Sequence, residues 1–257
     1  MGKIISVHSF RGGTGKSNLV ANLAAALATQ GKRVAVIDTD IQSPGIHVLF
    51  NLDLKQVTYT LNDYLLGRCS VDAPVFDVTR SLQAERGQQV TARNGAIYLI
   101  PSSMKVDEIT TILSDGYDIG LLTQAFQQLV NHLNLDFLLI DTHPGINEET
   151  LLSIGLSDAL IVILRPDQQD FQGTALTVRV AKQLKIPKMG LVVNKLLPEF
   201  DRNEVKATME KTFDAPVVGI LTLETDMIRL GSRDLFCLKF PDHPLSQQLH
   251  QLSHWLA

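Results

Sequence analysis

A glycine-rich segment near the start of the chain has the residue types that bind phosphate groups. Three glycines occur among the four positions directly before Lys16 and Ser17. Glycine leaves backbone N–H groups able to converge on an anion, and the start of a helix adds positive dipole charge. A lysine here reaches β- and γ-phosphates, and the Ser17 hydroxyl is a natural Mg²⁺ ligand. The expected contact residues of this phosphate-binding loop are Arg11, Gly12, Gly13, Thr14, Gly15, Lys16, Ser17 and Asn18.

Three aspartates end apolar runs that would bring them close to such a loop. Asp38 and Asp40 follow one run, and Asp141 ends the run Phe137–Ile140. Alternate residues of an extended segment point the same way, so Asp38 and Asp40 are both able to address one site. The competing interpretation is that one of them caps a turn, as aspartate often does.

These residues are placed by a regular alternation of short apolar runs and helical patterns. The runs are continuous and β-branched, which is typical of strands buried on both faces. Strands are predicted at 4–7, 34–37, 97–100, 137–140, 159–164, 189–193 and 217–221. Helices are predicted at 16–30 (with Gly31 as its C-cap), 106–113, 119–133, 150–157, 173–184, 204–213, 226–233 and 245–256.

This alternation predicts an α/β fold with a doubly wound, mostly parallel sheet and helices on both faces. Ligands of such sheets bind outside the carboxyl ends of the strands, where the loop and the aspartates fall. We interpret residues 1–257 as a single domain. Residues 53–95 are polar and turn-rich, and they predict an elaborated connection with a short helix near 60–66.

The loop departs from the generic pattern G-x-x-x-x-G-K-[ST], because Phe10 occupies the first glycine position. Its form is x-[KR]-G-G-x-G-K-[ST], and here the sequence resembles the MinD/ParA-type P-loop ATPases. The resemblance covers essentially the full length in strand order. It implies a P-loop NTPase fold of the MinD/ParA/NifH kind, with ATP and Mg²⁺ as cofactors. It also implies a homodimer that forms on ATP and hydrolyses it slowly until a partner protein stimulates the reaction.

The resemblance also implies roles for individual residues. Arg11 stands where the family has a signature lysine that reaches the partner subunit's phosphates. Arginine and lysine are not interchangeable at a phosphate, so a contact within its own subunit or a solvated surface position stays open for Arg11. Lys16, Asp40 and Arg11 are the expected catalytic residues, with Asp40 orienting the attacking water. The expected metal ligands are Ser17, Asp38 and Asp141, the last as the Walker B acid.

Two further segments match the family more loosely. Thr142 to Gly145 resembles switch II, in which the Gly145 amide would sense the γ-phosphate. Pro144 falls one place later than in the common D-x-P-x-G form, and this makes His143 unusual. A structural or partner-contacting role for His143 is favoured over a general base.

The base-binding end of the site is less marked. Asn194 ends a strand where relatives carry an asparagine that forms a hydrogen bond with the adenine amino group. The alternative is that Asn194 only forms the turn at the end of that strand. No N-K-x-D guanine signature follows it, so ATP is favoured over GTP. The segment Arg165-Pro166-Asp167 lines either the base or the dimer interface.

Composition excludes several other classes of function. The 257 residues include 23 Lys and Arg against 27 Asp and Glu, a net charge of −4, which argues against a wholesale electrostatic nucleic-acid binder. Cys69 and Cys237 are far apart and form no C-x-x-C pair, so zinc, thiol redox and an iron–sulfur cluster within one subunit lack support. No signal peptide or membrane-spanning run is evident, and we expect a cytoplasmic protein.

The expected partners are a second copy of the chain and an unknown protein cargo or activator. Non-specific DNA binding stays open, because the segment from Arg179 to Lys211 is the most basic part of the chain. Membrane binding is disfavoured, since the apolar last helix carries no Lys or Arg after Lys239. The resulting hypothesis is an ATP-driven switch in the cytoplasm. Its recruitment to a nucleoid or membrane surface stays open. Its alternative is a nucleotide-dependent scaffold with little or no hydrolysis.

Overall fold

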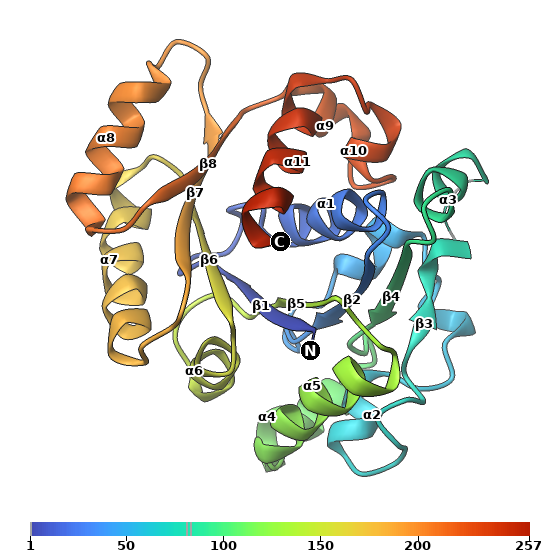
Figure 1. The fold of residues 1–257 in the computed structure, drawn as a ribbon. Coiled ribbons are helices and arrows are strands. Elements are labelled where there is room, and N and C mark those ends of the chain that lie inside the picture. Colours follow the sequence, from blue (N-terminus) through green and yellow to red (C-terminus); the bar gives the residue numbers. More distant parts are fainter. Residues whose placement is uncertain (1, 81, 83) are drawn as a thin grey trace.

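The computed structural model describes residues 2–80, 82 and 84–257. Its centre is an eight-stranded sheet with the order β3-β4-β2-β5-β1-β6-β7-β8 (Figure 1). Neighbouring strands are parallel except β3 and β4, which are antiparallel, so the predicted mostly parallel sheet is confirmed. The strands are β1 (Lys3–His8), β2 (Arg33–Asp38), β3 (Phe76–Asp77), β4 (Ala96–Ile100), β5 (Phe137–Asp141), β6 (Ala159–Leu164), β7 (Met189–Leu196) and β8 (Val217–Thr222).

Helices cover both faces of the sheet, as Figure 1 shows. The α-helices are α1 (Lys16–Ala28), α2 (Leu61–Leu65), α3 (Ala84–Thr91), α4 (Val106–Asp115), α5 (Gly120–His132), α6 (Glu148–Gly155), α7 (Gln168–Gln183), α8 (Arg202–Phe213), α9 (Thr225–Leu230), α10 (Phe236–Lys239) and α11 (Pro244–Leu256). Short 3₁₀ segments are η1 (Ile46–Phe50), η2 (Leu54–Gln56) and η3 (Val78–Arg80).

Strand β6 illustrates why the apolar runs are continuous. Ile161 and Ile163 belong to the core beneath α1, α10 and α11. Leu160 and Val162, which alternate with them, belong to the core beneath α7 and α8. A strand covered on both faces buries every side chain, whichever way it points.

The first helix is shorter than predicted. It ends at Ala28 and not at Gln30, but Gly31 terminates it as predicted, since the Lys32 N–H also donates back to the Leu27 carbonyl at 3.3 Å. Gly31 has a φ of +84° and donates its N–H to the Ala28 carbonyl at 2.9 Å. The glycine therefore closes the turn that follows the helix, where a left-handed residue is needed.

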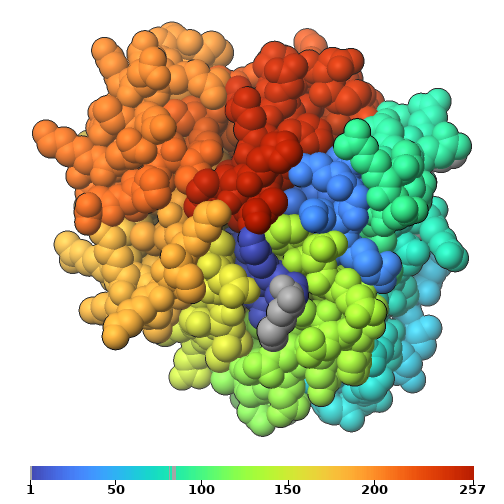
Figure 2. Space-filling model, viewed as in Figure 1, coloured from blue at the N-terminus to red at the C-terminus, as the bar shows by residue number. Residues whose placement is uncertain are grey.

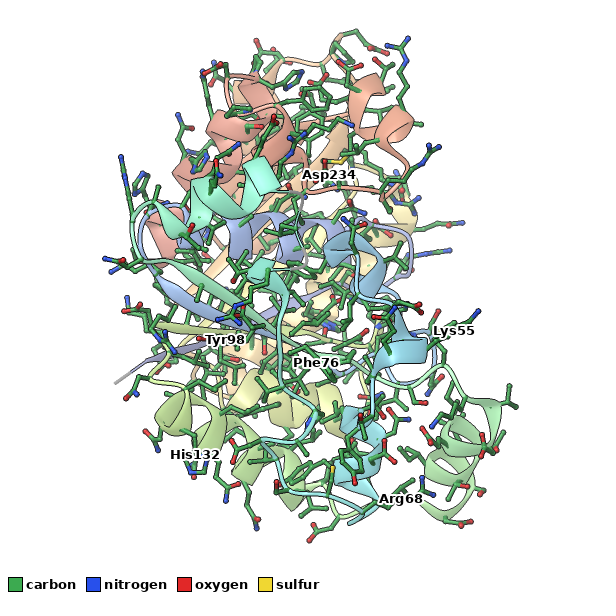
Figure 3. All side chains as sticks on the ribbon, turned by 90° about the vertical axis from the view of Figure 1, so that its right-hand side faces the viewer. Lys55, Arg68, Phe76, Tyr98, His132 and Asp234 are labelled. Atoms are coloured by element: carbon green, nitrogen blue, oxygen red, sulfur yellow. The ribbon has the colours of Figure 1, made fainter. Side chains whose placement is uncertain are left out.

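The connection 53–95 contains the predicted short helix, α2, and two elements that the sequence did not reveal. One is β3, whose Phe76 and Asp77 pair with Leu99 and Tyr98 of β4 (Figure 3). The other is the polar helix α3, whose Arg86 Nε lies 3.5 Å from Asp234 Oδ2. A two-residue strand has no measurable periodicity, and α3 lacks an apolar stripe, so neither leaves a pattern to detect.

The last helix docks on the domain, as predicted. Leu245, Leu249, Leu252 and Leu256 are all buried in the core beneath α1. The ammonium of Lys3 donates to the Leu256 carbonyl at 3.1 Å, and Figure 2 shows the red C-terminal segment lying next to the dark blue N-terminal strand. The apolar stripe of α11 is thus used inside the fold.

Candidate functional site

The carboxyl ends of three neighbouring strands create the site. In the register of the sheet, Asp38 of β2 and Val7 of β1 both lie beside Asp141 of β5. Strand β1 continues into the glycine-rich loop, which then begins α1. Parallel strands place their carboxyl ends at one edge, so the loop meets the acids that follow β2 and β5 there.

The glycines shape the loop into an open cradle. Gly13 and Gly15 have φ angles of +77° and +96°, a region that favours glycine. A Cβ added to Gly12 or Gly13 would meet no atom within 4 Å, which leaves space over the loop. The cavity here measures about 190 Å³ and is lined by Ser9, residues 12–18, Asp40 and Pro144. Its dimensions and its backbone donors suit a phosphate group.

A buried ion pair lies beneath this cradle. Lys16 Nζ is 2.6 Å from Asp141 Oδ1, and the two side chains are only 6% and 1% exposed. Burial raises the pKa of Asp38 well above its usual range, and the neighbouring charge of Asp141 raises it further while Lys16 opposes the rise. One ammonium therefore compensates two crowded carboxyl groups, and a divalent cation would do the same more strongly.

The two aspartates after β2 have different environments. Asp38 accepts hydrogen bonds from the backbone N–H of Asp40 at 3.0 Å and of Gly45 at 3.3 Å. The turn-capping role thus falls to Asp38. Asp40 faces the phosphate cavity, and its buried Oδ1 has no hydrogen-bond partner among the described residues. Burial raises the pKa of Asp40, and the charge of Lys16 opposes this. An orphaned buried acceptor at this place suits a bound water or ligand.

Arg11 has a partner within its own subunit. Its Nε lies 3.8 Å from Asp170 Oδ1, and the arginine side chain is 43% exposed while Asp170 is buried. Asp170 also accepts from the backbone N–H of Arg165 at 2.9 Å and from its Nε at 3.2 Å. Asp167 caps α7 by accepting from the Asp170 N–H. The segment 165–167 therefore anchors the acid that holds Arg11, and the sequence alone did not indicate Asp170.

Strand β7 braces the outer side of the loop. Asn194 Nδ2 donates to the Thr14 carbonyl at 2.7 Å, and Lys195 Nζ donates to the Gly13 carbonyl at 2.8 Å. Both residues lie where the register of β7 and β8 shifts, and Lys195 has a left-handed φ of +59°. This irregularity turns two consecutive side chains toward the loop. Lys195 was missed by sequence analysis, although the adjacent Asn194 was identified.

A second cavity adjoins the first and measures about 380 Å³. The two cavities share Gly13, Gly15 and Asn18, and Asn194 lines the second one. Apolar side chains of β8, α9 and α11 line much of the remainder, among them Leu221, Met227 and Leu249, and polar residues such as Asn22 and Glu224 complete it. An apolar slot beside a phosphate cradle has the character of a base-binding pocket. The Asn194 amide donates to Thr14 through its nitrogen, which directs its oxygen elsewhere as an acceptor.

The residues present fit Mg²⁺ together with a nucleoside triphosphate. Within the described part of the chain, no group of three or more His, Cys, Asp or Glu side chains forms a ready metal cage. Mg²⁺ does not need one, because it keeps waters and takes phosphate oxygens with one or two protein ligands. Ser17 lines the cavity, and Asp38 and Asp141 lie beneath it. Cys69 and Cys237 pack against opposite faces of the sheet.

His8 is a buried side chain at the same strand end. Its Nδ1 lies 2.9 Å from Thr142 Oγ1, which itself donates to the Val7 carbonyl at 3.0 Å, so Nδ1 carries the proton. Burial lowers the pKa of His8 from 6.5 to about 3, and the charges of Lys16 and His143 contribute. At pH values between these two pKa values, His8 binds a proton in the unfolded chain but not in the folded chain. The stability contributed by neutral His8 is complete above pH 6.5 and is lost as the pH falls toward 3.

We expect His8→Asn to weaken this acid sensitivity, since its Nδ2 still donates to Thr142 but does not titrate. Between pH 7 and pH 5 the free energy of unfolding of the wild type should fall by about 2 kcal/mol more than that of the variant. Urea denaturation at the two pH values measures the difference. Equal pH dependence in the two proteins would contradict a neutral, buried His8.

The cradle after β1, the acids after β2 and β5 and the helix α1 define a P-loop nucleotide-binding protein. A family model described as "ParA: NUBPL iron-transfer P-loop NTPase" matches residues 1–256. The chain therefore belongs to the ParA family of P-loop NTPases, and the resemblance to MinD/ParA-type proteins is confirmed.

Individual relatives agree with this assignment. An uncharacterised ATP-binding protein of Methanocaldococcus jannaschii is 27% identical over 97% of this chain and 85% of its own length. An iron–sulfur cluster carrier protein of Methanococcus maripaludis is 32% identical over 77% of this chain and 63% of its own length. The septum site-determining protein MinD of Pyrococcus horikoshii, solved with Mg-ADP, has a TM-score of 0.80 at 21% identity, covering 100% of this chain and 96% of that one. At the level of the family, ATP and Mg²⁺ are confirmed as the cofactors.

Proposed function

We propose that the protein is an ATP-binding and ATP-hydrolysing switch that forms a homodimer on ATP and positions a cellular cargo or complex. The observation that carries this proposal is the Lys16–Asp141 pair beneath an open glycine cradle, next to the orphaned oxygen of Asp40. A buried pair of this kind is stable only while both partners stay together. When a phosphate and a cation enter the site, the phosphate becomes a new partner for Lys16 and the cation a new partner for Asp141.

Each residue has a proposed task in that exchange. The N–H groups of the loop and Lys16 bind the phosphates, and Asn194 accepts from the adenine amino group. Ser17, Asp38 and Asp141 would hold Mg²⁺, and the cation would neutralise charge on the phosphates. Asp40 orients the attacking water, and the Gly145 amide senses the terminal phosphate. Phosphoryl transfer needs mainly such positioning and charge compensation.

The homodimer would bring two cradles face to face. Arg11 is half-exposed at the edge of the loop, and its contact with Asp170 at 3.8 Å is looser than a close ion pair. We infer that a partner's phosphates compete with Asp170 for the guanidinium. Arginine offers a planar fork that suits phosphate oxygens.

The test compares the wild type with Asp40→Ala by light scattering coupled to size exclusion, in the apo, ADP and ATP states. We expect an ATP-dependent dimer in both proteins. Turnover in the variant should fall by about 10²-fold or more, because the water loses its orienting carboxylate. A wild type that binds ATP and stays monomeric would contradict the dimer. A wild type without turnover would favour the alternative, a nucleotide-dependent scaffold.

Iron–sulfur carriage is a second candidate, because relatives carry that name and the family model is described as iron-transfer. The chain spans about 60% of those carriers' length. Cys237 is buried, and burial raises its pKa to about 12, so it is a poor ligand as it stands. Cys69 lies on the other side of the sheet. Reconstitution with iron and sulfide should therefore give no cluster absorbance, and a stable cluster would establish this function instead.

The contacts of the basic segment 179–211 bear on where the switch acts. Several basic side chains between 179 and 211 make contacts within the chain: Lys182 binds Asp214 at 2.6 Å, and Arg202 donates to the Ile220 carbonyl at 2.6 Å. Because these side chains already have partners within the chain, they do not favour DNA as the surface on which the switch acts. Across the described residues, the helices lack the length and apolarity needed to traverse a bilayer. We propose action in the cytoplasm through a protein partner, with recruitment to nucleoid or membrane decided by that partner.

A further inference from the structure

His143 lies next to the proposed catalytic acid. It follows Thr142 at the start of the switch II segment, and its Nε2 is 3.8 Å from Asp40 Oδ1. The histidine and aspartate side chains are 20% and 13% exposed. The Nδ1 atom of the same ring lies 2.6 Å from the Pro144 carbonyl oxygen. The ring is therefore held with one fixed edge toward the cradle.

The hydrogen-bonding partners decide what that edge offers. A carbonyl oxygen only accepts, so Nδ1 carries the hydrogen and the Nε2 of a neutral ring presents a lone pair. Asp40 Oδ1 is also an acceptor, and it is buried without a partner among the residues that the structure describes. With a neutral ring, two acceptors face each other across 3.8 Å, a gap too wide for a direct hydrogen bond.

One water molecule would satisfy both acceptors. Water has two hydrogens, and an oxygen about 2.8 Å from each acceptor is consistent with this gap. The phosphate cavity lies beside this gap, because Asp40 and the neighbouring residue Pro144 line it with the glycine loop. A water held there by both of its hydrogens has its lone pairs available toward the terminal phosphate.

We propose that His143 is a catalytic residue, which together with Asp40 holds the attacking water as a pair of acceptors. This rests on the proposed ATP hydrolysis. The water oxygen forms a bond to the γ-phosphorus while the bond from that phosphorus to the β–γ bridging oxygen breaks. ADP leaves with the bridging oxygen, and the water proton bound to Asp40 passes through that carboxylate to the phosphate product or solvent. His143 accepts the second hydrogen bond and fixes the direction of attack.

A purely structural role would require the His143 ring to connect elements of the fold. In the described structure its hydrogen bond is to the neighbouring residue Pro144, and none joins it to another helix or strand. Loss of the ring nitrogens thus leaves the fold and the cradle in place. An effect confined to turnover, with ATP affinity unchanged, separates the two interpretations.

The test uses His143→Phe, which keeps a ring without nitrogens, and His143→Gln, which keeps an acceptor near the position of Nε2. Single-turnover hydrolysis of Mg-ATP is measured with excess protein, together with ATP affinity and the lifetime of the ATP-dependent dimer. We expect His143→Phe to slow turnover by about 10- to 100-fold, with affinity within about twofold of the wild type and a longer-lived dimer. His143→Gln should recover most of the rate. In an Asp40→Ala background, His143→Phe should add little, since the water has already been released.

Several results would overturn the inference. They are an unchanged rate in His143→Phe, an equal loss of rate and ATP affinity, or a full additional loss in the Asp40→Ala background. If the wild type hydrolyses ATP and Asp40→Ala does not, while His143→Phe is normal, this inference alone fails. If the wild type binds ATP without hydrolysing it, the proposed function fails and the role of His143 with it.

Discussion

Lys16→Ala should weaken ATP binding strongly and destabilise the protein even without nucleotide. The ammonium makes charged hydrogen bonds whose loss costs about 3 kcal/mol, so ATP affinity should fall roughly a hundredfold. Without ATP, the variant leaves Asp141 buried at 1% exposure beside Asp38, with no cation to compensate either carboxyl group. Breaking one side of a buried pair costs about 3–5 kcal/mol. Isothermal titration with ATP and urea denaturation of the apo protein measure the two effects.

The matched control separates lost binding from lost stability. Replacing both partners, as in Lys16→Met with Asp141→Asn, removes the buried pair together with the negative charge of Asp141, which leaves Asp38 as the one buried carboxyl group of this cluster. We expect the double variant to regain most of the apo stability and none of the ATP affinity. If Lys16→Ala were as stable as the wild type, Lys16 would not be compensating the acids beneath the cradle.

Gly15→Ala should deform the cradle on the side that faces β7. Gly15 has a φ of +96°, and an added Cβ would lie 2.5 Å from Asn194 Nδ2, an atom that holds the Thr14 carbonyl. The left-handed conformation alone costs about 1–2 kcal/mol for a residue with a Cβ. Asn194 must also withdraw, and the loop loses one of its two braces. We expect ATP affinity to fall by more than about tenfold, because the N–H groups no longer converge.

Two further variants separate the steric contact with Asn194 from the backbone cost of the left-handed conformation at Gly15. In the apo protein, Gly12→Ala should be close to neutral in stability, since its Cβ meets nothing within 4 Å and its φ is not positive. Asn194→Ala in the Gly15→Ala background removes the steric contact and should restore part of the stability, while the backbone cost stays. If Gly15→Ala bound ATP like the wild type, the brace from β7 would not be shaping the loop.

The sequence predicted most of the fold because the strands that carry it are buried on both faces. Continuous apolar runs such as 137–140 and 159–164 leave a strong pattern, and all seven predicted strands are present. The spacing of Gly12, Gly13, Gly15 and Lys16 predicted the cradle, since a phosphate loop is local in the chain. The short β3 and the polar α3 were missed, because their stability comes from tertiary contacts and not from their own composition.

Other features of the site required the tertiary structure. Asp170 holds Arg11, Lys195 braces Gly13, and His143 faces Asp40 from a different strand end. Each pair is separated in the chain by a crossover whose geometry no local pattern encodes. The sequence by itself determined the class of fold, the phosphate loop and the acids that surround it, because these depend on periodicity and short-range spacing. Only the tertiary structure decided which side chains meet at that edge, because register and burial set distances between strands that are far apart in the chain.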